Sequence, residues 1–497
     1  MDSSRAYELA DESLEKFKRK LAVLKAKGTV ILSFDDLAKK LFNSTTLDEI
    51  FNGLEIRDDA SGKQPTPATQ ILKIYLILSD GECARVVKLR SRGWHDNREE
   101  GDAHFRQQRQ RADSTTPEEE RKFYNMMLQI GEEMHDAHHI FTIPFVPDGQ
   151  VNIFDLCMAP GGYTAAALDY CNAYKAYGIT LAPKSGGHTV IIDKNRLKCL
   201  KLHDITMFTE FCPRNKKIPD AFKSRFSDIK PFNSIRFHLV FADGKTLRTH
   251  DRIKNTYDAD LNKETVRLQT SQLILAMNRL YNGGTLVMLL HKIDTWHSAF
   301  LLYTFSKFSK VEVFKPIRKH ATRSSFYMVA KEIDINHAEA FKAVEGWKED
   351  WYRATFGGPD ETGLPKEEPT IEVVQELLTE FGPQLIKLGR KAWKIQADAL
   401  NHTSYAGSKT DGVKLGFRKR VWDGLKGVFK DHHEGLRMER GMGYVPIGGR
   451  GAGGWVAAPD GQVISGSSRG AGIEDRNITG SIASTTGDNR AVFMMGT

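Results

Sequence analysis

The sequence predicts an α/β fold with a wound, largely parallel sheet, helical additions at both ends and a disordered glycine-rich tail. Three observations predict it: apolar runs alternate with helical stretches, one run leads into a Pro-Gly-Gly turn, and glycine is frequent near the end of the chain. Alternating strands and helices are typical of a wound, largely parallel sheet. The apolar runs are 152–159, 175–181, 238–243, 284–291, 309–316 and 324–333, with helical stretches near 163–173, 263–282 and 294–308 between some of them.

The length of 497 residues predicts additions around a core, because single cores usually stop growing earlier. Thr116 and Pro117 mark a helix start, since threonine caps and proline suits the first helical position. The last 57 residues hold 14 glycines and too little apolar content to offset chain entropy. The polar stretch 90–113 is expected to be an exposed loop. The expected regions are a helical region of unknown role at 1–115, the α/β domain at 116–335, a helical extension at 336–440 and the disordered tail at 441–497.

Composition limits the class of protein. The net charge of +8 and pI near 9.0 favour a polyanionic partner, although a solvated basic surface explains them equally well. The five cysteines are odd in number and never spaced as Cys-x-x-Cys, which argues against a disulfide framework and a metal site. No long apolar run and no signal peptide are present, so a soluble intracellular protein without membrane contact is expected. Nucleus and cytoplasm are not distinguished, and neither is the oligomeric state.

The turn after the first apolar run is the main candidate site. An apolar strand ends in Asp155 and passes through Ala159-Pro160-Gly161-Gly162 into a helix that begins near Tyr163. In wound sheets, ligands bind at the carboxyl ends of strands. Glycine lacks a β-carbon, which allows unusual dihedrals and a close approach to a ligand, and the helix N-terminus presents free N–H groups.

This turn resembles the first motif of the FtsJ-like family of ribosomal RNA ribose 2′-O-methyltransferases, which reads as Asp-Leu, small or apolar residues, and then Pro-Gly-Gly-aromatic. The resemblance extends from Tyr124 to Ile333. It implies a Rossmann-like S-adenosylmethionine-dependent methyltransferase fold with this cofactor across the strand ends. The cofactor-binding residues that it implies here are Asp155, Ala159, Pro160, Gly161, Gly162 and Tyr163.

Two further residues are similar to the family's cofactor contacts. Leu202-His203-Asp204-Ile205 looks like the stretch whose acid accepts a hydrogen bond from the adenine amino group, which implies that role for Asp204. A helix cap is the alternative for such an aspartate. Thr180 stands where the family often has an acid that binds the cofactor ribose, and a hydroxyl cannot make a carboxylate's bidentate contact.

The catalytic residues match the family less well. The apolar strand that ends in Asp243-Gly244 is similar to the strand that delivers the family's catalytic aspartate, with a turn-forming aspartate as the alternative. Active members use a Lys-Asp-Lys-Glu tetrad, and here Leu289 and Ser325 stand at the places of the second lysine and the glutamate. The candidate lysines are Lys292, three residues beyond Leu289, and Lys122, about one turn early in the helix before the glycine motif.

The spacing raises a geometric problem for Lys292. Three residues along a strand cover ~10 Å and reverse the side-chain face, so Lys292 replaces the family lysine only if a bulge or an early strand end redirects it. With Asp243, Lys292 and Lys122 as candidate catalytic residues, we expect methyl transfer to an RNA ribose 2′-hydroxyl. One alternative is a catalytically impaired domain that binds S-adenosylmethionine or RNA, and another is a different α/β activity. The candidate RNA contacts are Arg318, Lys319, His320, Arg323, and Arg418, Lys419 and Arg420 with Trp422.

Overall fold

The structure is a computed structural model. It describes residues 66–93, 97–113, 116–143, 149–246 and 258–407. The predictions for the glycine-rich tail at 441–497 and for the basic run near Arg418 lie outside the described residues.

Seven strands form one sheet in the order β3-β2-β1-β4-β5-β7-β6. The neighbours from β3 to β5 are parallel, whereas β7 runs antiparallel between β5 and β6. The chain therefore starts in the middle at β1, adds β2 and β3 on one side, and then crosses to β4. Such a switch point is where wound sheets bind ligands. This topology confirms the predicted Rossmann-like α/β fold. The strands are β1 Asn152–Leu156, β2 Lys175–Thr180, β3 Leu197–Leu202, β4 Phe237–Ala242, β5 Leu280–His291, β6 Lys310–Phe314 and β7 Ser325–Ile333.

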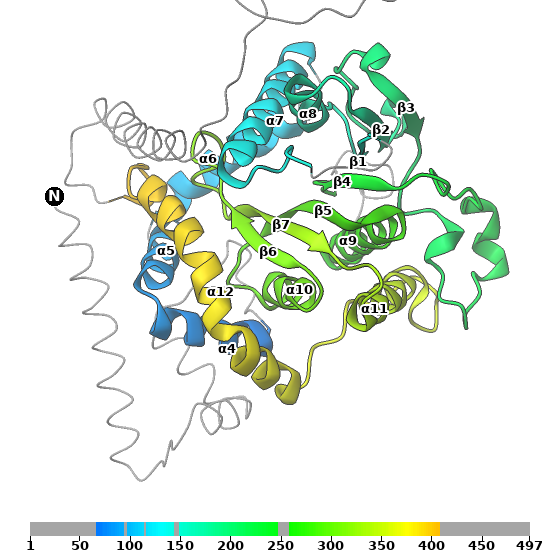
Figure 1. The fold of residues 1–497 in the computed structure, drawn as a ribbon. Helices are drawn as coiled ribbons and strands as arrows, with labels where there is room; N and C mark the ends of the chain where they lie inside the picture. Colours follow the sequence, from blue (N-terminus) through cyan, green and yellow to red (C-terminus); the bar gives the residue numbers. More distant parts are fainter. Residues whose placement is uncertain (1–65, 94–96, 114–115, 144–148, 247–257, 408–497) are drawn as a thin grey trace, which may run out of the picture. The chain divides into compact units, whose positions relative to one another are not determined.

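Helices cover both faces of the sheet (Figure 1). Successive strand residues point to opposite faces, so Ile153 and Leu239 pack with α7 and α8, whereas Phe154 and Val240 pack with α9 and α10. The strand residues of β1 and β4 are almost completely buried, which is why their sequences read as continuous apolar runs. These helices are α7 Pro117–His138, α8 Gly162–Tyr170, α9 Asp258–Arg279, α10 Trp296–Ser306 and α11 Ala338–Phe356.

Two N-terminal helices, α4 (Pro67–Ser79) and α5 (Gly81–Ser91), pack against α12 (Ile371–Leu400). Asp80 joins the three. One of its carboxylate oxygens caps α5 by accepting from the backbone N–H groups of Glu82 and Cys83, and the other accepts from Arg390 of α12 at 2.6 Å. Helices from opposite ends of the described chain therefore form one layer.

A buried ionic network connects this layer to the end of β5. Arg90 donates to both carboxylate oxygens of Asp294 at 2.9 Å and to the Gln396 side-chain oxygen at 2.8 Å. Lys73 lies 3.6 Å from the same carboxylate, and both side chains are fully buried. Although burial opposes ionisation, Arg90 and Lys73 hold the pKa of Asp294 well below its usual range.

Polar residues led to one wrong prediction and to one missed strand. The stretch 98–113, expected as a loop, forms helix α6 (Arg98–Asp113), because arginine, glutamate and glutamine favour helix even without an apolar face. β3 was not predicted, because lysines interrupt its apolar residues at this edge of the sheet. The short 3₁₀ turns are Pro183–Ser185, Lys194–Arg196, Thr209–Phe211 and Asp220–Arg225.

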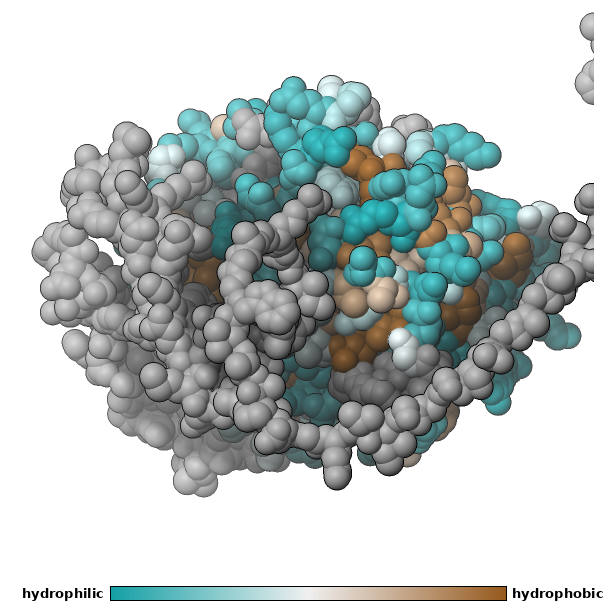
Figure 2. Space-filling model, turned by 45° about the horizontal axis from the view of Figure 1, so that its top comes forward, coloured by the Kyte–Doolittle hydropathy of each residue, from teal (hydrophilic) through white to brown (hydrophobic). Residues whose placement is uncertain are grey.

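The described surface mixes hydrophilic and hydrophobic side chains, as the face in Figure 2 shows. Across the described parts of the chain, no helix is both long enough and apolar enough to cross a membrane. The large apolar side chains that are exposed are Tyr170, Leu202, Ile229, Tyr281 and Phe341.

The Arg90 network predicts a large loss of stability from one substitution. Arg90→Met leaves the buried Asp294 carboxylate with Lys73 alone, and breaking a buried pair costs about 3–5 kcal/mol in the free energy of unfolding. Denaturant unfolding followed by circular dichroism at pH 7 measures this loss.

The matched control is Arg196→Met. Arg196 pairs with Asp169 at 2.7 Å, but the two side chains are 34% and 53% exposed. Such a surface pair is worth about 1 kcal/mol or less. Equal, small losses in both variants would contradict the assigned importance of the buried network.

Candidate functional site

The glycine turn lies at the carboxyl end of β1 and leads into α8. Gly161 has φ +100°, and a β-carbon there would lie 2.6 Å from Ile192 Cγ2. A β-carbon on Gly162 would lie 2.4 Å from the backbone oxygen of Tyr124 in α7. The two glycines thus allow other parts of the same chain to pack on the turn, which the expectation of close ligand approach did not foresee. The predicted cofactor-binding residues from Ala159 to Tyr163 are all buried.

Hydrogen bonds from β2 and from the following segment hold this turn in place. The backbone N–H of Ala159 donates to the Thr180 hydroxyl at 3.3 Å, and Thr180 is only 4% exposed. The carbonyl of Pro160 accepts from the N–H groups of Ile191 and Ile192. The structure thus places the Thr180 hydroxyl underneath the turn, where it positions the backbone.

Asp155 is completely buried at the end of β1. It accepts a hydrogen bond of 2.6 Å from the Thr164 hydroxyl in the first turn of α8. Burial, and next to it the charge of Asp243, raises the pKa of Asp155 well above its usual range. Through this hydrogen bond Asp155 joins β1 to α8.

Asp243 follows β4 directly and lies half-buried across the switch point from Asp155. Burial raises the pKa of Asp243 to about 7, and the charge of Lys245 opposes that rise. Gly244, between Asp243 and Lys245, is held by Gln272 of α9. The side-chain amide of Gln272 accepts from the Gly244 N–H at 2.8 Å and donates to the Gly244 carbonyl at 3.2 Å.

Three strand ends meet around the thiol of Cys157. Burial raises the pKa of this thiol, and the charges of Asp243, Asp155 and Asp204 raise it further. These acids follow β4, end β1 and follow β3. The structure thus brings together three of the residues that the sequence predicted, in a region lined by carboxyl groups.

Two buried tyrosines, one from α8 and one from β7, are hydrogen-bonded to each other near the site. Tyr163 of α8 and Tyr327 of β7 are each 2% exposed, and their hydroxyls lie 2.5 Å apart. Burial and the charge of Asp243 contribute to a raised pKa at both phenols. The sequence predicted a cofactor contact for Tyr163, whereas its hydroxyl is bonded to Tyr327.

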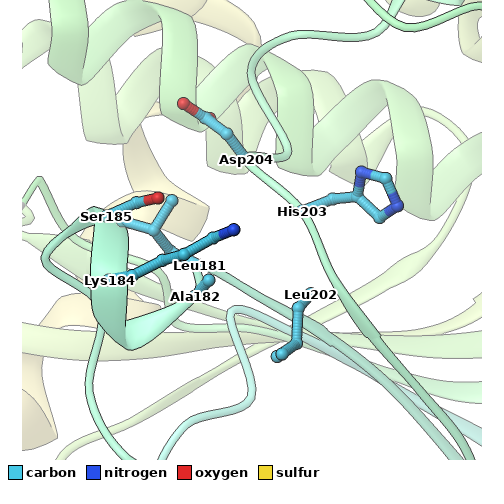
Figure 3. A pocket seen from close by; sticks show the side chains of 7 residues that line it. All are labelled: Leu181, Ala182, Lys184, Ser185, Leu202, His203 and Asp204. Carbon is cyan, nitrogen blue, oxygen red and sulfur yellow. The ribbon is translucent and has the colours of Figure 1, made fainter. Parts of the chain in front are cut away.

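A recess of about 340 Å³ opens where the segments after β2 and β3 face each other. In Figure 3, the Lys184 side chain extends toward the segment that carries Leu202 and Asp204, and the His203 ring turns away. Asp204 also accepts from the N–H and the hydroxyl of Thr206 at 3.0 and 2.8 Å. It therefore caps a turn and lines the recess at once. The lining residues are Leu181, Ala182, Lys184, Ser185, Leu202, His203 and Asp204.

The two predicted lysines lie in different surroundings. Lys122 is 59% exposed on α7 and pairs with Glu118 at 2.7 Å and Glu119 at 3.4 Å. Lys292 comes directly after β5, which ends at His291, and has φ +54°. Its charge helps to lower the pKa of Asp294.

The loop from Lys315 to Ser324 joins β6 to β7. It lies at the carboxyl end of β5, because β6 and β5 are both antiparallel to β7. Lys315 is 5% exposed and donates to the carbonyls of His320, Arg323 and Ser325. Glu133 of α7 accepts from the Ile317 N–H at 2.6 Å. The side chains of Arg318, Lys319 and Arg323 are exposed.

Reasoning from sequence missed Lys245, Gln272 and Tyr327. Lys245 stands two residues after Asp243, a place to which the resemblance assigns no role. Its contact is with the backbone of β5, and only the pairing of β4 with β5 makes that visible. Tyr327 follows Ser325 by two residues, but its hydrogen-bond partner Tyr163 comes from α8.

The model of the FtsJ-like methyltransferase family matches residues 132–333. No curated protein matches the sequence. Similar solved structures include an rRNA methylase from Streptococcus thermophilus (13% identity, 40% of this chain and 96% of that one, TM-score 0.24). NSun6 from Pyrococcus horikoshii is another (16% identity, 41% and 52%, TM-score 0.26). A third is a putative methyltransferase from Streptococcus mutans in complex with SAH (12% identity, 40% and 96%, TM-score 0.23).

The packing on the glycine turn predicts a position-specific effect of alanine. Gly161→Ala adds a β-carbon against Ile192 and also places a non-glycine residue at positive φ, which costs roughly 1–2 kcal/mol in strain. We expect the free energy of unfolding to fall by clearly more than this strain alone, as measured by denaturant titration.

Gly283→Ala is the matched control, because Gly283 has φ +84° and nothing lies within 4 Å of its added β-carbon. It carries the strain without the clash. The double variant Gly161→Ala with Ile192→Ala should recover part of the difference relative to Ile192→Ala alone. Equal losses in the two alanine variants would show that the turn has room for the side chain.

Proposed function

Because the model of the FtsJ-like methyltransferase family matches residues 132–333, we propose that the protein transfers a methyl group from S-adenosylmethionine to the ribose 2′-hydroxyl of RNA. The observation that carries the proposal is the convergence of Asp155, Asp204 and Asp243 around Cys157 at the switch point of the sheet. The donor has a positively charged sulfonium, and negative charge at the strand ends favours a cation there.

The recess between the segments after β2 and β3 supports a place for the adenosine part of the donor. Leu181 and the 51% exposed Leu202 offer apolar surface to a flat purine ring. Asp204, in the same recess, has a carboxylate that can accept from an amino group. Thr180, which the sequence proposed as a ribose contact, would act indirectly through the Ala159 backbone.

Asp243 is proposed as the general base. The bound donor supplies a methyl group, which bonds to the acceptor oxygen as the carbon–sulfur bond breaks and its electron pair stays on sulfur. The proton of the acceptor hydroxyl then goes to the Asp243 carboxylate. A base with a pKa near the working pH accepts a proton and also remains partly ionised, which is the favourable compromise for this role.

RNA is proposed as the acceptor because the basic loop at 315–324 borders the same strand ends. Arg318, Lys319 and Arg323 are exposed there and can contact phosphates. The loop's backbone is tied to Lys315 and Glu133, so these three side chains extend from a fixed base. Binding through phosphate contacts would weaken as salt concentration rises.

A binding protein without methyl transfer is the second candidate. Leu289 and Ser325 stand where the family's lysine and glutamate would be, and Lys122 pairs with acids on the exposed side of α7. In this reading the domain holds the donor or RNA but does not activate the hydroxyl.

Binding and transfer can be separated by two substitutions. Asp204→Ala should weaken S-adenosylmethionine binding by about tenfold, the value of one hydrogen bond to a charged group. Asp243→Ala should lower methyl incorporation into a pool of RNA by about 10²–10⁴-fold, a much larger loss than its effect on donor binding. Calorimetry measures the first effect, and transfer from labelled donor measures the second.

Asp220→Ala serves as the control, because Asp220 is 91% exposed and pairs only locally with Lys223. It should change neither measurement. Donor binding without labelling of any RNA by the unaltered protein would favour the binding-protein candidate. Absence of donor binding would contradict both candidates.

The pKa of Asp243 predicts the pH dependence of transfer. Because the base must be ionised, the single-turnover rate should rise with pH and level off above about 7. The rising part of the profile should be absent in Asp243→Asn. A rate that is flat between pH 5.5 and 8.5, or that falls across this range, would exclude Asp243 as the base.

A further inference from the structure

The side chain of Lys245 bridges the ends of β4 and β5. Lys245 follows Asp243 by two residues, and its amine donates to the backbone carbonyl of Leu289 at 3.3 Å. Leu289 is the position where the resemblance implies a lysine, and its own side chain packs in the apolar layer beneath α7 and α8. An amine from the neighbouring strand end therefore lies against the backbone of this position.

Asp243 and Lys245 act on each other electrostatically. Lys245 lowers the pKa of Asp243. Desolvation by the surrounding protein lowers the pKa of Lys245, and the charge of Asp243 raises it by less. The Gly244 backbone between them is bonded in both directions to Gln272. This clamp fixes the backbone from which the two side chains extend.

Other titratable groups also surround Asp243 and Lys245, and their charges contribute to the pH dependence of this pair. Burial and neighbouring cations lower the pKa of His291 to about 3 and of His297 to about 4, so both rings are neutral near pH 7. The groups that face the pair are Asp155 and Cys157 from β1 and its turn, Tyr163 from α8, Tyr327 from β7, His291 from β5 and His297 from α10.

We propose that Lys245 supplies the positive charge that keeps Asp243 ionised and stabilises the acceptor oxygen while its proton leaves, in place of a lysine from β5. The inference rests on the proposed methyl transfer. Lys245 gives up no proton in this step. Its charge offsets the negative charge that develops on the hydroxyl oxygen as the proton passes to Asp243. Its side chain remains exposed to solvent, as contact with an incoming acceptor requires.

Lys292 is the competing candidate, and its surroundings differ. Its charge lowers the pKa of Asp294 and of Lys73, in the network that joins β5 to α4 and α5. Its backbone N–H donates to the carbonyl of Ser324 at 2.9 Å, which ties it to the basic loop. These contacts assign Lys292 to the support of the strand end.

The test is the pH profile of single-turnover transfer in Lys245→Met, Lys245→Arg and Lys292→Met. Lys245→Met should lower the rate by about 100-fold and move the rising part of the profile to higher pH, because Asp243 loses the cation that favours its ionised form. Donor affinity, measured by calorimetry, should stay unchanged. Lys245→Arg keeps the charge and should keep the position of the rise, and so should Lys292→Met.

Lys223→Met is the control, since Lys223 is 60% exposed on a surface turn, and it should behave like the unaltered protein. The proposal is overturned if Lys245→Met keeps both the rate and the profile, or if Lys292→Met produces the loss and the shift in its place.

A second measurement keeps the proposal testable if no RNA is methylated. Carboxyl carbon-13 labelling of aspartate, with the Asp243 signal assigned by its loss in Asp243→Asn, reports the pKa of Asp243 without any turnover. Lys245→Met should raise this pKa, whereas Lys292→Met should not. An unchanged pKa in Lys245→Met would refute the inference even if the methyltransferase proposal holds.

Discussion

The crowding of carboxyl groups at the carboxyl ends of β1 and β4 is the constraint on which the rest of the site depends. Asp155 is completely buried near Asp243, and the charge of Asp243 opposes the ionisation of Asp155. The two carboxyl groups differ in their surroundings. Asp155 is fully buried and accepts a hydrogen bond from Thr164, whereas Asp243 is half-buried beside Lys245. One carboxyl thus serves the fold and the other is left near its titration point, which is the state that acid–base work requires.

Much of this arrangement could be predicted from sequence, and the failures have physical causes. β1 and β4 could be recognised as apolar runs because both faces of each strand are covered. β3, at the edge of the sheet, contains lysines that interrupt the apolar pattern. Asp243 was located because an apolar run ends there. Lys245 was not, because its amine contacts a backbone carbonyl of another strand, and no side-chain pattern records such a contact. Thr180 and Gly161 lie at the turn after β1, where their contacts are with other parts of the protein.

The helical additions meet the α/β domain at one buried network. Arg90 comes from the N-terminal region, Asp294 from the end of β5, and Gln396 from α12. Gln396 in turn donates to the Thr322 carbonyl and the Ser324 hydroxyl of the basic loop. Because a buried ion pair is tolerated only when its partners are complete, the three regions depend on one another at the edge where the candidate site lies.

Lys315 restrains the backbone of the basic loop through hydrogen bonds, in addition to adding a basic residue to it. Its buried amine donates to two backbone carbonyls of the loop and to that of Ser325, the first residue of β7, and these hydrogen bonds act as an internal crosslink. A segment restrained in this way has already lost most of its conformational freedom before any anionic strand arrives. The ordering entropy of association is therefore small, and the affinity of Arg318, Lys319 and Arg323 for phosphates would depend on enthalpy and ion release more than on the folding of a flexible segment.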